Sequence, residues 1–169
     1  MKVALGGTLT VSAAGTATTD SLTINNVGSG ITALGNQSLD LNGIETFTYN
    51  GSGTGSATTQ TVDDIDLTGV STGGTAKVIF TGTNAVTFKS GALVSANELD
   101  FSAVTGVVAM DTAMEYIGAS GSGTLKGGTK GDTLKGDTGE AMTIEGGAGN
   151  DDITGGSAVD TINAGAGND

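Results

Sequence analysis

The chain has 169 residues, 31 of them glycine, and it contains no proline, cysteine or histidine. Its 18 acidic and 6 basic side chains give a net charge of −12, which argues against nucleic-acid binding because phosphates are neutralised by clustered lysine or arginine. A chain without histidine or cysteine also lacks a Ser-His-Asp triad, a cysteine nucleophile and a histidine-based zinc site. We therefore do not expect an enzyme.

Short triplets of the form apolar, polar, apolar recur through the first 117 residues. Such alternation over short runs predicts half-buried strands, and the segments rich in Gly, Ser, Thr and Asn between them predict tight turns. The triplets are Leu9-Thr10-Val11, Leu22-Thr23-Ile24, Leu39-Asp40-Leu41, Phe47-Thr48-Tyr49, Ile65-Asp66-Leu67, Val86-Thr87-Phe88 and Leu99-Asp100-Phe101. Their uneven spacing predicts an irregular, all-β parallel solenoid over residues 1–117, in which stacked coils bury apolar positions that one coil alone leaves exposed.

Residues 118–169 follow a stricter nine-residue pattern, G-G-x-G-x-D-x-U-x, in which U is a large apolar residue. Units begin at Gly127, Gly146, Gly155 and Ala164, with an irregular unit between the first two. The glycines let the backbone turn tightly and adopt positive φ, and the aspartate at the sixth place adds a carboxylate to inward-pointing carbonyls. Such an all-oxygen set suits a hard cation such as Ca²⁺. The pattern predicts a calcium-binding parallel β-roll that continues the solenoid.

In such a roll one repeat is a turn plus a strand, and two repeats make one coil. The large apolar residues at the eighth place point into the roll. They are Leu125, Leu134, Ile144, Ile153 and Ile162.

Alternate turns stack on the same edge of the roll, and the first edge carries Asp132, Asp151 and Asp169 in a column. We expect one Ca²⁺ between Asp132 and Asp151 and a second between Asp151 and Asp169. The second edge departs from the pattern: Gly123 takes the aspartate place in one turn and the next turn has an extra residue, so Asp160 is at best a partial site. The expected carbonyl ligands are those of Gly128, Lys130, Gly147, Gly149, Asn150, Gly165 and Gly167.

A simpler interpretation is that Gly-Asp and Asn-Asp strings are ordinary turn formers. One such string would favour it, but four strings in nine-residue register with an apolar eighth place favour calcium. Charge points the same way, because eight of the 18 acids lie between residues 132 and 169 against one lysine, Lys135. This end repels itself unless cations bind, so we expect its folding to depend on Ca²⁺.

Two other groups of acids are candidate sites of a different kind. The acids within residues 63–66 have the residue types of a glycosidase, although adjacent acids before a strand favour a solvated turn. Asp100, Asp111 and Glu115 would supply an additional calcium site, although a solvated face is the simpler interpretation.

The sequence contains no apolar run long enough for a secretory signal or for a membrane span, which needs roughly 20 apolar residues. Its last residue, Asp169, falls at the sixth place of a repeat. We therefore expect a fragment of a longer protein and no membrane insertion.

Three segments resemble strands of bacterial surface-layer (S-layer) proteins and of related giant RTX surface proteins. Residues 41–49, LNGIETFTY, are similar to the "GIETL" strand of these proteins, and residues 64–70 and 98–106, DIDLTGV and ELDFSAVTG, resemble their "LDLSGVTG" segments. With the haemolysin-type nonapeptides, the resemblance covers about residues 39–169. It implies secretion by a type I system of a Gram-negative bacterium, folding at the cell surface in extracellular calcium, and assembly into a two-dimensional lattice.

These observations favour a structural S-layer fragment whose main partner is itself. A cell-surface polysaccharide, bound through regions outside these residues, is a further expected partner, whereas nucleic acid and membrane are not. The alternatives are a calcium-stiffened adhesin stalk and the secretion tail of an RTX exoprotein whose catalytic domain precedes Met1. A phage or appendage fibre would need a trimer seam, and the sequence shows none.

Overall fold

The computed structural model describes residues 7–12, 19–26, 37–52, 59–62, 64–67, 75–88, 94–110 and 123–169. These ranges contain 16 β-strands, and the strand pairs in them are parallel. The strands are β1 (Gly7–Ser12), β2 (Ser21–Asn26), β3 (Gln37–Asn42), β4 (Thr46–Gly51), β5 (Thr59–Val62), β6 (Asp64–Asp66), β7 (Lys77–Gly82), β8 (Ala85–Phe88), β9 (Val94–Ser95), β10 (Glu98–Val104), β11 (Val108–Met110), β12 (Gly123–Lys126), β13 (Thr133–Lys135), β14 (Met142–Glu145), β15 (Asp152–Thr154) and β16 (Thr161–Asn163). Within these ranges no helix is long and apolar enough to cross a membrane.

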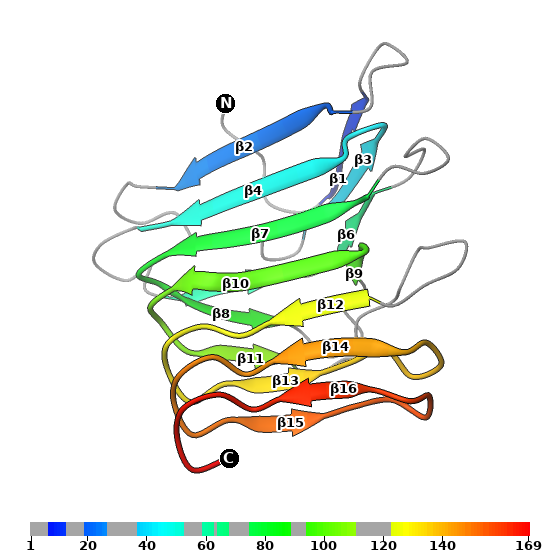
Figure 1. Cartoon of the computed structure of the whole chain (residues 1–169). Helices are drawn as coiled ribbons and strands as arrows, with labels where there is room; N and C mark the ends of the chain where they lie inside the picture. Colours follow the sequence, from blue (N-terminus) through cyan, green and yellow to red (C-terminus); the bar gives the residue numbers. More distant parts are fainter. Residues whose placement is uncertain are drawn as a thin grey trace.

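The strands form three parallel sheets (Figure 1). A four-stranded sheet has the order β1-β3-β6-β9, a seven-stranded sheet the order β2-β4-β7-β10-β12-β14-β16, and a five-stranded sheet the order β5-β8-β11-β13-β15. Neighbours in each sheet come from successive coils of the chain, so the backbone winds as a solenoid. The predicted class, an all-β parallel solenoid that continues into a β-roll, is confirmed.

The coils change from three sides to two along the chain. From β6 to β11 successive strands lie in the four-, seven- and five-stranded sheets in turn, whereas from β12 to β16 they alternate between the seven- and five-stranded sheets. In the two-sided part Thr124 pairs with Thr143, and Thr143 with Thr161, which makes coils of 19 and 18 residues. This is the length of two nonapeptides, with one insertion in the first coil. The three-sided coil from Lys77 to Glu98 takes 21 residues.

Two of the three sheets run across the predicted boundary between residues 117 and 118. β12 pairs with β10, and β13 pairs with β11, so the roll stacks directly on the solenoid (Figure 1). The four-stranded sheet ends upstream, at β9. The division into one unit of residues 1–117 and another of residues 118–169 stays a prediction.

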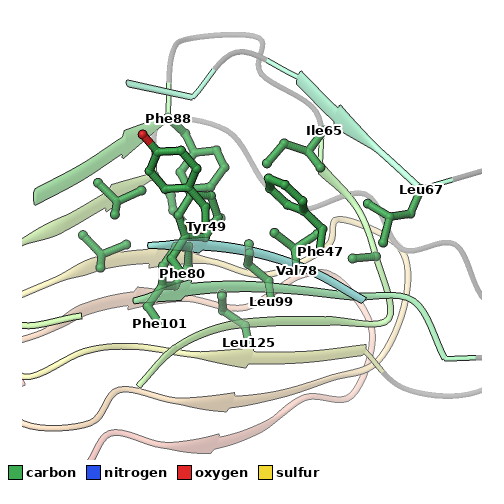
Figure 2. Close-up of a cluster of buried hydrophobic side chains, with 14 of the residues drawn as sticks. Phe47, Tyr49, Ile65, Leu67, Val78, Phe80, Phe88, Leu99, Phe101 and Leu125 are labelled. Carbon is green, nitrogen blue, oxygen red and sulfur yellow. The ribbon is translucent and has the colours of Figure 1, made fainter. Parts of the chain in front are cut away.

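The three-sided coils enclose a core in which aromatic rings gather (Figure 2). Tyr49, Phe80, Phe88 and Phe101 are at most 3% exposed. The centroids of neighbouring rings lie 5.2 to 5.9 Å apart. Strand alternation places them there, because β4, β7, β8 and β10 each alternate between half-buried and buried residues up to the aromatic residue. Burying a side chain of this size contributes about 1.5–3 kcal/mol, so the cluster stabilises the wide upstream coils.

One apolar column runs through the seven-stranded sheet from the solenoid into the roll. The strand register pairs, in order, Phe47, Val78, Leu99, Leu125, Ile144 and Ile162. The first five are 0% exposed, whereas Ile162, in the last strand of the sheet, is 48% exposed. In the five-stranded sheet Leu134 is fully buried and Ile153 is partly buried against the core. The eighth-place residues of the nonapeptides thus form the core of the roll, as their spacing predicts.

Candidate metal centre

The first edge of the roll carries a ladder of hydrogen bonds between backbone and aspartate side chains. In each step an Oδ1 atom accepts the backbone N–H of the aligned residue one coil earlier: Val108 donates to Asp132 at 2.7 Å, Asp132 to Asp151 at 2.9 Å, and Asp151 to Asp169 at 2.9 Å. The structure therefore brings the three predicted aspartates of this edge into one column. Each of them ties its own coil to the preceding one.

Asp132 and Asp160 have both carboxylate oxygens occupied by backbone N–H groups. The Oδ2 atom of Asp132 accepts from Gly128 at 2.7 Å, and the residue is 2% exposed. On the opposite edge Asp160 accepts from Met142 at 2.9 Å and from Gly156 at 2.8 Å. Burial raises the pKa of Asp132 and the nearby Asp151 raises it further, against the lowering effect of the two N–H groups. We call these turns, residues 127–132 and 155–160, the closed turns.

The turns of residues 146–151 and 164–169 have a different backbone. The glycines at their second and fourth places have positive φ: 99° and 134° for Gly147 and Gly149, and 103° and 152° for Gly165 and Gly167. Glycine adopts this conformation readily because it has no Cβ. We call these turns the open turns.

In the first open turn Asp151 is 6% exposed, and among the described residues its Oδ2 atom has no hydrogen-bond partner. We call this atom the open oxygen. In the closed turns the N–H of the second-place glycine satisfies the equivalent atom. Leaving a buried acceptor unsatisfied costs about 1–3 kcal/mol, and more when it is charged. The open turn therefore presents a buried anionic oxygen that a cation would satisfy.

Backbone carbonyls of one turn lie close against the glycines of the next turn on the first edge. Their positions follow from the glycines beside them, where an added Cβ would collide with the turn of the preceding coil. The close approaches are the carbonyl of Gly128 to Gly147, that of Lys130 to Gly149, that of Gly147 to Gly165, and that of Gly149 to Gly167. A carbonyl oxygen has two lone pairs, so those that already accept a backbone N–H, as the Gly128 and Gly147 oxygens do, keep an acceptor site.

Asn150 lies in the same stack through both its backbone and its side chain. Its carbonyl oxygen lies against Gly131 of the preceding turn. Its side-chain Oδ1 atom accepts the N–H of Asn168 at 3.0 Å. The predicted ligand residues of the first edge are thus all located between or within its three stacked turns, whereas Asp160 lies on the other edge.

In the part of the chain that the structure describes, no three acidic, histidine or cysteine side chains come together as a metal-binding cluster. A cation on the first edge would therefore take one carboxylate from a turn and complete its shell with carbonyl oxygens. Ca²⁺ accepts six to eight oxygen ligands in flexible geometry. The donor set of the open turns fits this ion.

Glu45 and Asn97 are corner residues that the sequence analysis did not identify. Each directly precedes a strand of the seven-stranded sheet, as Asp160 does, and each accepts a backbone N–H from one coil earlier. Glu45 Oε2 accepts from Asp20 at 2.8 Å, and Asn97 Oδ1 accepts from Ala76 at 2.7 Å. The signal available was a polar residue immediately before an alternating strand, in the strings GIETF and ANELDF. These residues do in the solenoid what the aspartates do in the roll.

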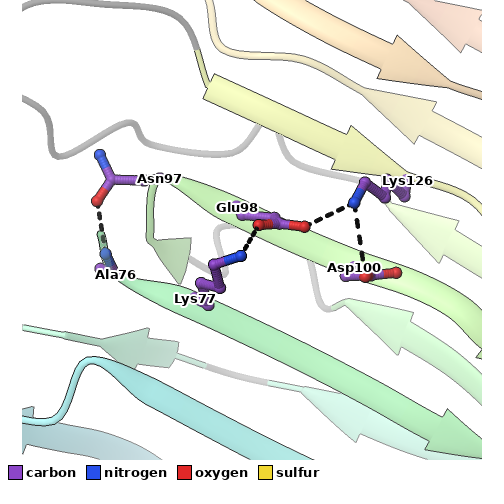
Figure 3. A network of polar contacts seen from close by, with 6 residues as sticks. All are labelled: Ala76, Lys77, Asn97, Glu98, Asp100 and Lys126. Atoms are coloured by element: carbon purple, nitrogen blue, oxygen red, sulfur yellow. Dashed lines mark hydrogen bonds and ion pairs between the residues drawn. The ribbon is translucent and has the colours of Figure 1, made fainter. Parts of the chain in front are cut away.

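Asp100 belongs to an ion-pair network on the outer face of the seven-stranded sheet (Figure 3). Glu98 contacts Lys77 and Lys126, the latter at 2.7 Å, and Lys126 lies 3.9 Å from Asp100. Burial raises the pKa of Glu98, but the two lysines outweigh it, so the pKa is lowered. This pairing favours the simpler interpretation of Asp100 over an additional calcium site. Asp111 and Glu115 of this proposed calcium site lie outside the described residues. Of the acids considered for a glycosidase, Asp63 also lies outside them, whereas Asp64 and Asp66 lie in β6.

Comparison with known proteins identifies the repeat. The family model of the RTX calcium-binding nonapeptide repeat (4 copies) matches residues 143–169. This stretch contains both open turns together with β15 and β16. No match was found among curated proteins or among solved structures. The ion that these repeats bind is Ca²⁺, in agreement with the prediction from their spacing.

Proposed function

We propose that this chain, whose residues 143–169 are RTX-type calcium-binding repeats, is part of a bacterial cell-surface protein that folds and assembles into a lattice in extracellular Ca²⁺. The β-roll is a structural, non-catalytic fold, and its repeats are of a type found in secreted proteins. The single observation that carries the proposal is the open oxygen of Asp151, a buried carboxylate atom in a turn lined by carbonyls.

Electrostatics supports a folding step that depends on calcium. Residues 136–169 hold seven acidic side chains and no lysine, so stacking their turns brings like charges together. Bound Ca²⁺ supplies positive charge and takes oxygen ligands only. The open turns at residues 146–151 and 164–169 would hold it through the Asp151 carboxylate and the carbonyls between the turns. Because the unfolded chain has no such site, the binding free energy adds to folding.

Self-association through the outer faces of the solenoid is the second part of the proposal. The seven-stranded sheet presents a broad surface of Thr, Lys and Glu side chains on successive parallel strands, among them Thr46, Lys77 and Glu98, which pair in register. The resemblance to S-layer strands supports a lattice built from such faces. Contact with a cell-surface polysaccharide is proposed for regions outside these residues.

An adhesin stalk is the second candidate function. The coils stack along a single axis from β2 to β16 (Figure 1), which suits a rod that calcium stiffens. The stalk and the secretion tail of an exoprotein share the calcium-dependent folding, but neither requires a lattice.

Calcium titration with far-UV circular dichroism and light scattering in the same cuvette tests both parts. We expect a cooperative gain of β signal with calcium in the native chain, followed by ordered assemblies visible by electron microscopy. Asp151→Asn should lose the calcium response, whereas the matched control Asp152→Asn, which removes the same charge from the exposed neighbour, should keep it. A full β signal in chelator would contradict calcium-triggered folding. A normal calcium response without assemblies at any concentration would contradict the lattice and favour the stalk.

A further inference from the structure

The coil of residues 123–135 differs in charge from the coils that follow it. It holds three lysines, Lys126, Lys130 and Lys135, and one acid, Asp132, whereas residues 136–169 hold seven acids and no lysine. Repulsion between stacked turns therefore begins only after this coil. The coil itself requires no cation to offset its charge.

The turn of this coil is closed. Among the described glycines of the roll, positive φ occurs at the second and fourth places of the open turns and not at Gly128. The fourth place here is Lys130, where the open turns have Gly149 and Gly167, and a residue with a Cβ disfavours the left-handed conformation. The Gly128 N–H consequently points at Asp132 and occupies the oxygen that is open in Asp151.

The coil is also bound to the solenoid by contacts that involve no metal. Asp132 accepts the N–H of Val108, which belongs to β11. Lys126 forms an ion pair with Glu98 of β10 at 2.7 Å. The neighbouring Leu125 is fully buried in the core column, paired in register with Leu99 of β10. β12 and β13 continue the sheets of β10 and β11.

From these contacts we propose that Asp132 is a positioning residue and not a calcium ligand. Residues 123–135 then form a coil that folds without calcium and serves as the template for the calcium-dependent coils after it. This departs from the expectation of an ion between Asp132 and Asp151 that uses both carboxylates. The inference rests on the calcium-triggered folding of the proposed function and is independent of lattice assembly.

The template coil provides strands on which the next coil can pair. β12 and β13 offer paired edges to β14 and β15, and the Asp132 N–H donates to Asp151 Oδ1 at 2.9 Å. Ordering therefore propagates from the solenoid toward Asp169 once calcium is bound by the open turns.

Amide hydrogen exchange of the native chain, measured by mass spectrometry in chelator and in calcium, tests the template. We expect β12 and β13 to be protected in both conditions, as β10 is, and β14 to β16 to be protected only in calcium. Exchange of β12 and β13 in chelator as fast as that of β14 to β16 would overturn the inference and leave calcium-triggered folding intact. Protection of all these strands in chelator would overturn both.

The role of Asp132 is tested by counting bound ions in equilibrium dialysis. Asp132→Asn should lower the melting temperature equally in chelator and in calcium and bind as many Ca²⁺ ions as the native chain. Asp151→Asn should bind fewer ions, and its melting temperature in chelator should change less. The loss of an ion in Asp132→Asn would overturn the assignment.

A second variant keeps the assignment testable if Asp132→Asn does not fold. Lys130→Gly gives the closed turn a glycine at its fourth place, as in the open turns. This variant should bind one more Ca²⁺ than the native chain. An unchanged number would show that the closed turn already holds its ion and would overturn the proposal.

Discussion

The hydrogen bonds of the corner residues Glu45 and Asn97 lead to a prediction that is independent of calcium. Asn97 Oδ1 accepts the N–H of Ala76 at 2.7 Å, and Ala76 is 0% exposed. Asn97→Ala leaves this buried donor without that acceptor, which costs about 1–3 kcal/mol. In a chain of this length each kcal/mol lowers the melting temperature by about 2–4 °C, so the expected decrease is roughly 2–12 °C.

The assay is thermal unfolding followed by circular dichroism, in chelator and in calcium, with Asn163→Ala as the matched control. Asn163 is exposed in the last strand of the same sheet. Its replacement should change the melting temperature by at most about 1–2 °C, because surface substitutions change stability by about 0.5 kcal/mol or less. The Asn97→Ala decrease should be the same in both conditions, because the bond lies in the three-sided coils. If Asn97→Ala had the same melting temperature as the Asn163→Ala control, the idea that corner side chains hold successive coils together would be refuted.

Three further variants test other parts of the account. Glu98→Gln should have a lower melting temperature than the native chain at neutral pH. Because the pKa of Glu98 is lowered in the folded state, this difference should shrink as the pH falls below about 4.5, the ordinary pKa of the group. Glu140→Gln, at an exposed position, is the control. Phe80→Ala removes a ring that contacts three others and should cost about 3–5 kcal/mol in urea unfolding, whereas a loss below 1 kcal/mol would contradict the core described here. Gly82→Ala, at φ 109° and against the carbonyl of Gly51, should cost about 1–3 kcal/mol by the same method; unchanged stability would show that this turn tolerates a side chain.

Period-two alternation predicted the strands well where one face is buried. All seven apolar triplets of the upstream half lie in or directly at a strand, from Leu9 in β1 to Phe101 in β10. β7 was missed because Val78, Ile79 and Phe80 are apolar in succession. The structure buries the first and third and turns Ile79 outward. The side chains of β7 therefore alternate in burial, although their residue types do not alternate between apolar and polar.

The number of sides of a coil could not be read from the pattern. A strand buried on one face looks alike whether its coil has two sheets or three, and the third sheet includes strands as short as β9. The corner bonds of Glu45 and Asn97 join residues 25 and 21 positions apart, and no short motif marks such distances.

At the candidate site the nine-residue period placed the aspartate column, because the coil length fixes which turns stack. It did not separate closed from open turns, since the same aspartate stands at the sixth place in both. The difference lies in the direction of one backbone N–H. Its signal in the sequence is the fourth place, glycine in the open turns and Lys130 or Ala158 in the closed ones.

The most direct test of the calcium account is a crystal structure of the chain grown in calcium, with anomalous scattering used to locate the ions. We predict an ion between the open turns, about 2.3–2.6 Å from the open oxygen of Asp151, with its remaining ligands drawn from the carbonyls of these turns. The account would be contradicted if no ion lay there and the Asp151 Oδ2 atom instead accepted the N–H of Gly147, as its counterparts do in the closed turns.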